Sequence, residues 1–358
     1  MAIQVAKTLE GSGTRKRVIY QSEALFSGSN NIQRVQSVNY SFTVPRTDVN
    51  QYGQLGQIER IITEVPTVSL DFTYHLNGVT NETHLLANGA LGASYGFMRD
   101  LNRPASNVYE QQFTVGLSNE GIDFNNGSTH TTNKGIIIPK GFLTSYSWTG
   151  AVGDVPSASV NAESTQFEVG TVTQNAVAGL NTNVPVVLRP GNVGFKSAPM
   201  VPGSATTPDA NADLPVLGFD IIHVQSFTTS IDIPRESIQR LGDKFEFARV
   251  ITFPIQATMS IEGIVSQQAA SKLEDIVGTN LTDSTDPGFA IDVECNKANA
   301  DSAVNGISLM FRDAKIEGHS VSSSIGANKS ITLDYSVQVD GGGTGVGAAK
   351  NGFFMKAI

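Results

Sequence analysis

Histidine and cysteine are the residues that most often bind metals or act as nucleophiles, and this chain has few of either. Its single cysteine, Cys295, excludes an intramolecular disulfide and a cysteine-only metal site, and we interpret it as a buried, small apolar residue. No H-E-x-x-H or C-x-x-C motif occurs, and the histidines never pair at metal-ligand spacing. They are His75, His84, His130, His223 and His319. The sequence predicts no metal site.

Carboxylates and glycine-rich loops are the other groups that could carry chemistry. Acidic clusters at 209–213 and 283–286 lack the spacing of a calcium-binding loop, so we interpret both as acidic turns. The run Gly341–Gly347 lacks the Lys-Ser/Thr pair of a phosphate loop, and no G-x-S-x-G motif occurs. A single tryptophan, Trp148, does not make the aromatic platform that a carbohydrate-active enzyme needs beside its carboxylate pair. We expect a protein that is not an enzyme and binds no cofactor.

The composition indicates an all-β protein that makes extensive contact with partners. The chain has 358 residues, of which 40% are hydrophobic and only 16% charged. Soluble proteins usually have about a quarter of their residues charged, so much of this surface is expected to lie against other subunits. Glycine is abundant, with 35 residues, and runs rich in Val, Ile, Thr and Ser alternate with polar turns. This pattern predicts many short strands.

The net charge of −9 argues against binding nucleic acid through its phosphates, which requires clustered Lys and Arg. The one strongly basic cluster, 15–17, is interpreted as a solvated strand entrance. Residues 1–13 contain no apolar run, so we expect no signal peptide. No stretch approaches the ~20 apolar residues of a membrane span. We therefore expect a soluble chain with no membrane-spanning segment.

The most informative feature of the sequence is an internal repeat. Residues 35–63 align without a gap on residues 224–252, and roughly a third of the pairs are identical. The identities include Val35-Gln36-Ser37 with Val224-Gln225-Ser226, Pro45-Arg46 with Pro234-Arg235, Gly53 with Gly242, Arg60 with Arg249, and Ile62-Thr63 with Ile251-Thr252. Residues 142–169 resemble 315–339 more weakly, with Val152-Gly153 on Ile325-Gly326. We predict two tandem domains, 1–172 and 173–358, with a linker at about 170–183.

Each copy is expected to begin with a strand, a turn and two further strands. Apolar residues alternate with polar ones from Val38 to Val44, where Pro45 ends the strand, and again from Val68 to Leu76. Residues 58–65 predict the strand between them. In the second copy the alternation runs through Phe245, Phe247 and Val250, and then through Ala257, Met259 and Ile261.

One helix is predicted with clear end signals. Ser266 is a suitable N-cap, one face carries the apolar residues of 269–277, and Gly278 provides the stop. The corresponding region of the first copy, His84–Leu91, is richer in glycine and has a weaker helical pattern. Residues 198–214 are interpreted as an exposed loop.

Two passages in each copy resemble the bacteriophage tail tube (major tail) protein family. One is the strand that ends in Pro-Arg, at 45–46 and 234–235, before a long pair of strands. The other is a closing hairpin with a glycine in its turn, at Leu143–Phe167 and Ile316–Val337. The resemblance implies two copies of a β-sandwich or barrel-like domain with one or two flanking helices. In that family single-copy subunits form hexameric rings that stack into a tube, so this duplicated chain would form trimeric, pseudo-hexameric rings.

The resemblance also implies partners and a location. The chain would associate with itself, with tip or baseplate and terminator proteins, and with a sheath where the tail has one. It would be assembled in the host bacterial cytoplasm and reside in the virion tail. DNA would pass through the lumen without specific binding, and an acidic lumen would repel its phosphates. The long inserts 78–134 and 266–305 would decorate the outside or bridge rings.

Four arginines that the repeat places at equivalent positions are candidate interface residues. Arg suits interface ion pairs, although solvated strand-end arginines explain the same positions. The candidates are Arg46, Arg60, Arg235 and Arg249. Strand edges left open by each copy must also be paired or protected, and ring closure would remove them.

Several neighbouring functions stay open from the sequence. A baseplate protein or tube initiator shares the same kind of fold, as does the inner tube of a contractile injection system. A capsid decoration protein or an adhesin could also be built from two β-sandwiches, but it would not polymerise. Copy number in the particle separates a tube subunit from these alternatives, because a tube contains many copies.

Overall fold

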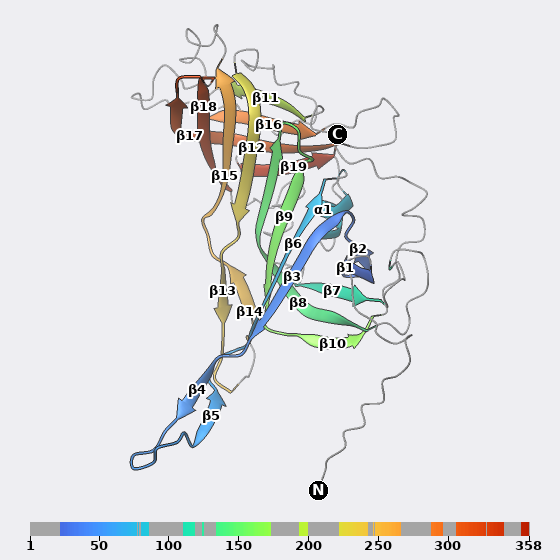
Figure 1. Ribbon diagram of the computed structural model, residues 1–358, viewed down its shortest axis with the longest axis vertical. Coiled ribbons are helices and arrows are strands. Elements are labelled where there is room, and N and C mark those ends of the chain that lie inside the picture. The colour runs from blue at the N-terminus through green and yellow to red at the C-terminus, as the bar shows by residue number, and fades with distance from the viewer. Residues whose placement is uncertain are drawn as a thin grey trace.

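The computed structural model describes residues 22–76, 78, 80–85, 110–118, 124, 134–172, 193–199, 222–242, 246, 248–265, 288–295, 306–326, 328–339 and 352–357. Eight antiparallel strands form one continuous sheet, the main sheet, along the long axis of the molecule (Figure 1). Their order is β3 (Val35–Thr43), β6 (Thr67–His75), β9 (Ser157–Ser164), β8 (Lys134–Ala151), β12 (Ile222–Asp232), β15 (Ile255–Val265), β18 (Ser330–Val339) and β17 (Ile307–Ser322). The first four strands belong to the first half of the chain, so the sheet crosses from one half to the other.

Each half also has a smaller sheet that packs on the apolar face of the main sheet. The first contains β2 (Asn30–Asn31), β1 (Glu23–Ser27), β7 (Gln111–Leu117), the start of β8, and β10 (Glu168–Thr171). The second contains β11 (Val193–Pro199), β16 (Phe289–Cys295), the start of β17, and β19 (Gly352–Ala357). The long strands β8 and β17 therefore belong to both layers of their half. Between the layers, the rings of Phe72 and Phe113 lie 6.0 Å apart and those of Phe289 and Tyr335 lie 5.9 Å apart.

Two hairpins interrupt the main-sheet strands. The hairpin of β4 (Arg46–Val49) and β5 (Glu59–Ile62) follows β3 and projects away from the body (Figure 1). The hairpin of β13 (Arg235–Ile238) and β14 (Ala248–Ile251) follows β12 in the same way. The hairpin turns contain Gly53 at φ 87° and Gly242 at φ 95°, a backbone conformation that favours glycine.

The strand pairings of the first half recur in the second half. The pairs β3–β6, β6–β9 and β9–β8 have counterparts in β12–β15, β15–β18 and β18–β17. The smaller sheets repeat in the same manner, because β1–β7–β8–β10 corresponds to β11–β16–β17–β19. Local irregularities repeat as well: β3 is bulged at Val35/Ser37 and β12 at Val224/Ser226. A second bulge occurs at Leu143/Ser145 and at Ile316/Gly318.

The alternation of the sequence places one face of each strand in the core. Val68, Leu70, Phe72 and Tyr74 are at most 2% exposed, which confirms the predicted strand 68–76. The two closing hairpins form as predicted, as β8–β9 and β17–β18, with Gly153 and Gly326 at positive φ in their turns. The predicted strand 58–65 is the shorter and exposed β5, because it lies in the projecting hairpin.

Several sequence predictions have other outcomes. The predicted helix 266–277 lies outside the described residues, and so do Phe245, Phe247 and the glycine run 341–347. Helix α1 (Thr80–Leu85) overlaps the weakly helical region of the first copy. Within the predicted linker, Gly170 and Thr171 lie in β10, and 173–183 are not described. Of the predicted loop 198–214, residues 198–199 lie in β11 and the rest are not described.

Cys295 is a free thiol with no exposed surface, which confirms its interpretation as a buried residue. Burial raises the pKa of this thiol to about 12. Among the helices described, none is long and apolar enough to cross a membrane.

Helix α1 is held to the main sheet by a buried carboxyl group. Glu82 is fully buried, and its Oε1 accepts hydrogen bonds from the hydroxyls of Tyr74 at 2.9 Å and Tyr146 at 3.3 Å. The neighbouring Asn81 both donates to and accepts from the backbone of Gln33, each at 2.8 Å. Burial raises the pKa of the Glu82 carboxyl to about 7, although the hydrogen bonds act in the opposite direction.

This pKa shift predicts that the free energy of unfolding depends on pH and that Glu82→Gln weakens the dependence. Between the unfolded value of 4.5 and about 7 the folded chain binds more protons than the unfolded chain, so stability falls as pH rises. The free energy of unfolding that Glu82 contributes falls by about 3 kcal/mol as the pH rises through this range. Urea denaturation of the dissociated chain at pH 5 and pH 8 measures it. Glu82→Gln should shrink the difference between the two pH values, whereas the exposed Glu168→Gln should leave it at the wild-type value. An unchanged difference in Glu82→Gln would contradict this account.

Candidate functional site

The two halves of the chain are joined by a ladder of backbone hydrogen bonds between β8 and β12. Seven residue pairs, from Ser226 opposite Ala151 to Asp232 opposite Ser145, form an uninterrupted antiparallel register. At one end the amide of Val152 donates to the carbonyl of Gln225 at 2.8 Å. At the other end the amide of Ile233 donates to the carbonyl of Thr144 at 2.7 Å. We call this region the internal joint.

Large apolar side chains fill the core side of the internal joint. Trp148 is fully buried, and its ring meets that of Phe227 edge-on at 5.9 Å. Phe227 in turn contacts Phe195 of β11 edge-on at 5.3 Å. Ile231 and Tyr146, which lie opposite each other, are each 1% exposed. The two halves therefore share a continuous apolar core, and each buried aromatic contributes on the order of 2 kcal/mol.

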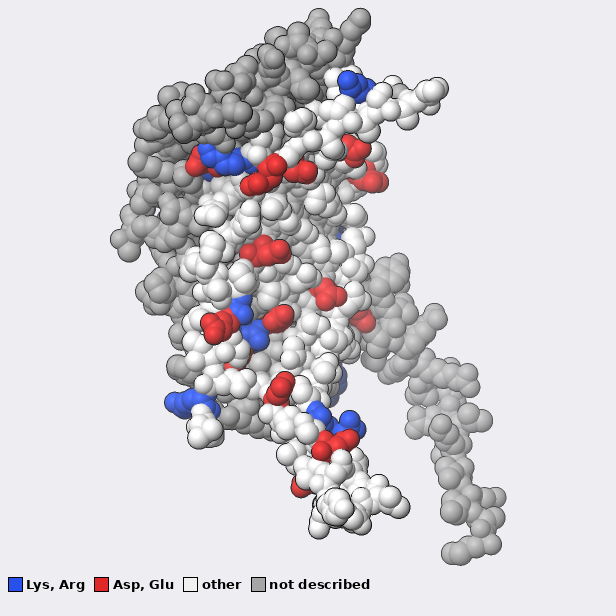
Figure 2. Space-filling model, turned by 90° about the vertical axis from the view of Figure 1, so that its left-hand side faces the viewer, with Lys and Arg blue, Asp and Glu red and all other residues white. Residues whose placement is uncertain are grey.

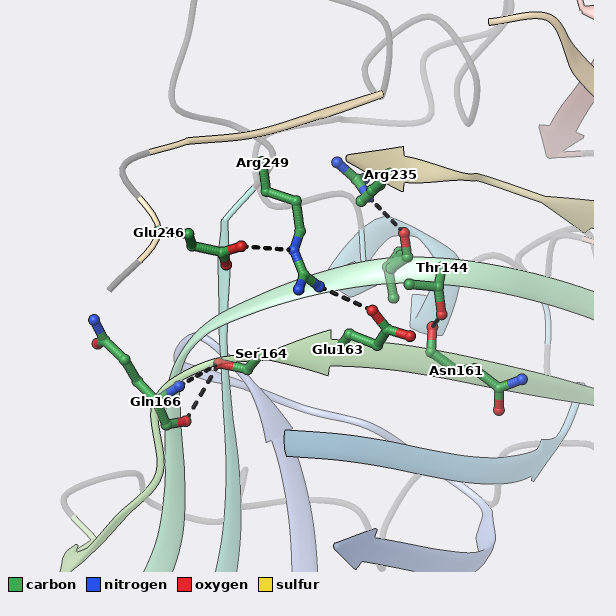
Figure 3. A network of polar contacts seen from close by, with 9 residues as sticks. Thr144, Asn161, Glu163, Ser164, Gln166, Arg235, Glu246 and Arg249 are labelled. Carbon is green, nitrogen blue, oxygen red and sulfur yellow. Dashed lines mark hydrogen bonds and ion pairs between the residues drawn. The ribbon is translucent and has the colours of Figure 1, made fainter. Parts of the chain in front are cut away.

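Two of the four predicted interface arginines lie at this joint (Figure 3). Arg235 Nε donates to the carbonyl of Leu143 at 2.9 Å. Arg249 bridges two carboxylates, with Nε 3.1 Å from Glu246 and Nη1 3.0 Å from Glu163. Both guanidinium groups lie over the ring of Phe142, at 5.4 and 5.5 Å from its centroid. These contacts connect the β13–β14 hairpin to β8 and β9 of the first half.

The other two predicted arginines lie at the matching positions of the β4–β5 hairpin. Arg46 begins β4 and is exposed, and Arg60 in β5 pairs with Asp48 at 3.1 Å. The Arg60 side chain is 59% exposed, whereas that of Arg249 is 10% exposed. Residues at matching positions therefore have different surroundings, because among the described residues no other strand lies against β4–β5. Whether any of the four contacts another subunit stays a prediction.

Two stretches of the main sheet have a pairing neighbour on only one side. Among the described residues β3 pairs only with β6, and residues 318–322 of β17 pair only with β18. Apolar side chains are exposed along both: Tyr40 is 46% exposed, Phe42 48% and Val321 42%. Their counterparts at the internal joint, Thr229, Ile231 and Trp148, are at most 2% exposed. An open strand edge presents unpaired N–H and C=O groups to another strand.

The outer face of the main sheet is polar, and its own strands contribute no basic side chain to it, although Arg249 of β14 reaches Glu163 there. From Ser145 in β8 and Gly318 in β17, and throughout the other six strands, there is no Lys or Arg. Hydroxyl groups pair across the strands, as between Ser41 and Ser69 at 2.7 Å and between Ser230 and Thr258 at 2.8 Å. The carboxylates of this face are Asp71, Glu163, Asp232, Glu262 and Asp334. Figure 2 shows one side of the molecule, where acidic groups are spaced over a mainly uncharged surface and several Lys and Arg groups lie beside them.

Open strand edges and the internal joint are the main features of the described residues that could bind another strand. In the part of the chain that the structure describes, no three His, Cys, Asp or Glu side chains group together as a metal would need. The sequence matches no protein-family model and no curated protein. The candidate functional site is therefore the pair of open edges, with the internal joint as its intramolecular counterpart.

Sequence reasoning points to the arginines but not to these particular edges. Tyr40 and Phe42 alternate with polar residues just as core residues do, so their pattern predicts burial. Among the described residues no strand lies beyond β3, and that arrangement depends on pairing between distant segments. The signal that the sequence does contain is the repeat itself, because β12 is equivalent to β3 and has a neighbour on each side.

The contrast between Arg249 and Arg60 predicts unequal stability losses in the dissociated chain. Arg249→Met would leave the Glu246 carboxylate, 7% exposed, without its partner, and should cost about 2–3 kcal/mol. Arg60→Met removes only an exposed ion pair and should cost less than about 0.5 kcal/mol. Urea denaturation at a concentration that keeps the chain dissociated measures both. Equal losses would show that the internal joint does not depend on Arg249.

Proposed function

We propose that this chain is a structural subunit that polymerises through its open strand edges into closed rings, which stack to form a bacteriophage tail tube. The observation that carries this proposal is the internal joint. It is a strand-to-strand junction between two similar halves, and the outer ends of the same sheet offer the two complementary sides of that junction.

We infer further that the chain is a tandem duplication of one tube domain. The recurring strand pairings, the bulges at equivalent positions and the glycine turns support this inference. Because each chain would supply two similar units, three chains would close a pseudo-sixfold ring. Closure leaves no free edge, which protects the subunit from uncontrolled strand addition.

The polar face of the main sheet is the proposed wall of the lumen. Its carboxylates would repel DNA phosphates, and because its strands carry no Lys or Arg, with Arg249 already paired to Glu163, the genome would not be retained. DNA would pass without specific binding. The hypothesis loses its support if replacing Asp71 and Asp334 by Lys leaves the rate of DNA passage through assembled tails unchanged.

The β4–β5 hairpin is the proposed contact between stacked rings. It projects from the body (Figure 1). Several of its apolar side chains are exposed. Tyr52 and Leu55 are fully exposed, at 104% and 110%, and Ile58 is 50% exposed. Exposed apolar groups in such number mark interaction sites. Further proposed partners are the tip or baseplate, terminator and sheath proteins of a virion tail assembled in the host bacterial cytoplasm.

Negative-stain electron microscopy across a concentration series tests the proposal. The wild-type chain should form rings or hollow tubes with threefold or sixfold end views. Tyr40→Pro should remain dissociated, because the amide of residue 40 would point to the open edge: amides of alternate residues along β12, such as that of Ile233, donate to β8.

Tyr40→Phe is the matched control, since it keeps the amide and should assemble as the wild type does. Circular dichroism should show that both variants remain folded. Assembly of Tyr40→Pro at wild-type concentrations would refute edge pairing. A wild-type chain that stays dissociated even with tail-tip components would favour the capsid decoration or adhesin alternatives.

A further inference from the structure

We propose that β3 of one chain pairs with residues 318–324 of a second copy in the register that β12 and β8 use at the internal joint, and that Arg60 and Glu317 form an ion pair across this contact. The inference rests on the proposed function and specifies its partner, a second copy of this chain. Both strands of the contact have an intramolecular counterpart, so the register can be transferred residue by residue.

The β-bulges determine how the strands are aligned. The bulge of β3 at Val35/Ser37 aligns with the bulge of β12 at Val224/Ser226. The bulge of β8 at Leu143/Ser145 aligns in the same way with the bulge of β17 at Ile316/Gly318. Hydroxyl pairs agree with both alignments, because Ser41–Ser69 matches Ser230–Thr258 and Thr149–Ser157 matches Ser322–Ser330.

The transferred register brings the exposed apolar groups together. The pair Thr229–Trp148 becomes Tyr40–Val321, and Ile231–Tyr146 becomes Phe42–His319. Ser230–Ser147 becomes Ser41–Ser320 on the polar face. The contact would thus cover Tyr40, Phe42 and Val321, the exposed apolar side chains of the two edges. Matching the apolar face of one strand to that of the next is what specifies register in a half-buried sheet.

Near the hairpin, the two chains would bring an arginine and a carboxylate together, as at the internal joint. The arginine is at the equivalent position, but the carboxylate comes from a different residue. Arg60 is the counterpart of Arg249, and Ser336 is the counterpart of Glu163. The acidic group is nevertheless present, because the exposed Glu317 accepts a hydrogen bond from Ser336 Oγ. Arg60 would then lie between its own Asp48 and the partner's carboxylate, as Arg249 lies between Glu246 and Glu163.

The stacking on Phe142 is not reproduced between chains. Its counterpart is Lys315, which pairs with Asp313 at 3.5 Å. Lys315 would approach the arginines of the incoming hairpin, so the carboxylate of Glu317 is the group that makes this corner attractive.

Cysteine cross-linking tests the register. At the internal joint Gln225–Val152 and Ile233–Thr144 are hydrogen-bonded pairs. Such pairs alternate with non-hydrogen-bonded pairs along an antiparallel ladder, so Ser230–Ser147 is a non-hydrogen-bonded pair. Such pairs have Cα atoms about 4.5 Å apart, within the range that a disulfide spans. Ser41→Cys with Ser320→Cys in one chain should therefore give covalent dimers and trimers on oxidation, and no larger species if three chains close the ring. Cys295 should not interfere, because it is 0% exposed.

The chain offers matched controls for this experiment. Ser147→Cys with Ser230→Cys should form an intrachain disulfide and no ladder. Ser41→Cys with Ser322→Cys, two residues out of register, should cross-link at least tenfold more slowly. Tubes by microscopy without a 41–320 disulfide would overturn the register while leaving the tube proposal standing. Failure of the wild-type chain to assemble would overturn the tube proposal itself.

Charge exchange tests the ion pair in the same assembly assay. Arg60→Glu should raise the concentration for half-maximal assembly by about tenfold, and adding Glu317→Arg to it should restore most of the loss. Arg60→Glu without effect, or no recovery in the double variant, would overturn the ion pair. Recovery with an intact 41–320 cross-link would support both parts of the proposal.

Discussion

Backbone hydrogen bonds between β8 and β12 join two similar halves, whereas among the described residues the outer sides of β3 and of the end of β17 pair with no strand. A strand in a sheet has N–H and C=O groups on both sides, and each must meet either another strand or water. The internal joint meets this requirement within the chain. The buried Trp148 and the paired Arg249 both lie where this joint brings the two halves together.

Equivalent positions of β8 and β17, and of the two hairpins, differ in size and exposure. Trp148, Phe142 and the largely buried Arg249 lie at a joint that is closed in the folded chain. Their counterparts Val321, Lys315 and Arg60 face solvent, and they are smaller or more readily hydrated. On the β17 edge, an exposed tryptophan and phenylalanine would carry a risk of aggregation. The β3 edge differs, because it exposes Tyr40 and Phe42 where the internal joint has Thr229 and Ile231. The two ends of the sheet therefore share a backbone geometry but not a side-chain composition.

The two faces of the main sheet have opposite roles. The inner face packs Phe72, Tyr74 and Met259 against the smaller sheets, which fixes the curvature and order of the strands. The outer face carries hydroxyl pairs and carboxylates, and its strands contribute no Lys or Arg, although Arg249 of β14 pairs with Glu163 there. Because side chains alternate between faces along a strand, a single period-two pattern specifies both the core and the polar wall.

The sequence by itself determined the strands, their faces and the repeat. The alternation from Val68 to Tyr74, the Pro-Arg strand ends and the glycine turns at Gly153 and Gly326 are local signals that depend on short-range sterics and period-two burial. Only the tertiary structure decided which edges stay open and which arginines are buried. Arg249 meets Glu163 across 86 residues of chain, and Glu82 becomes buried between Tyr74 and Tyr146 of different strands. Such pairings depend on the order of strands across the sheet, which local periodicity does not encode.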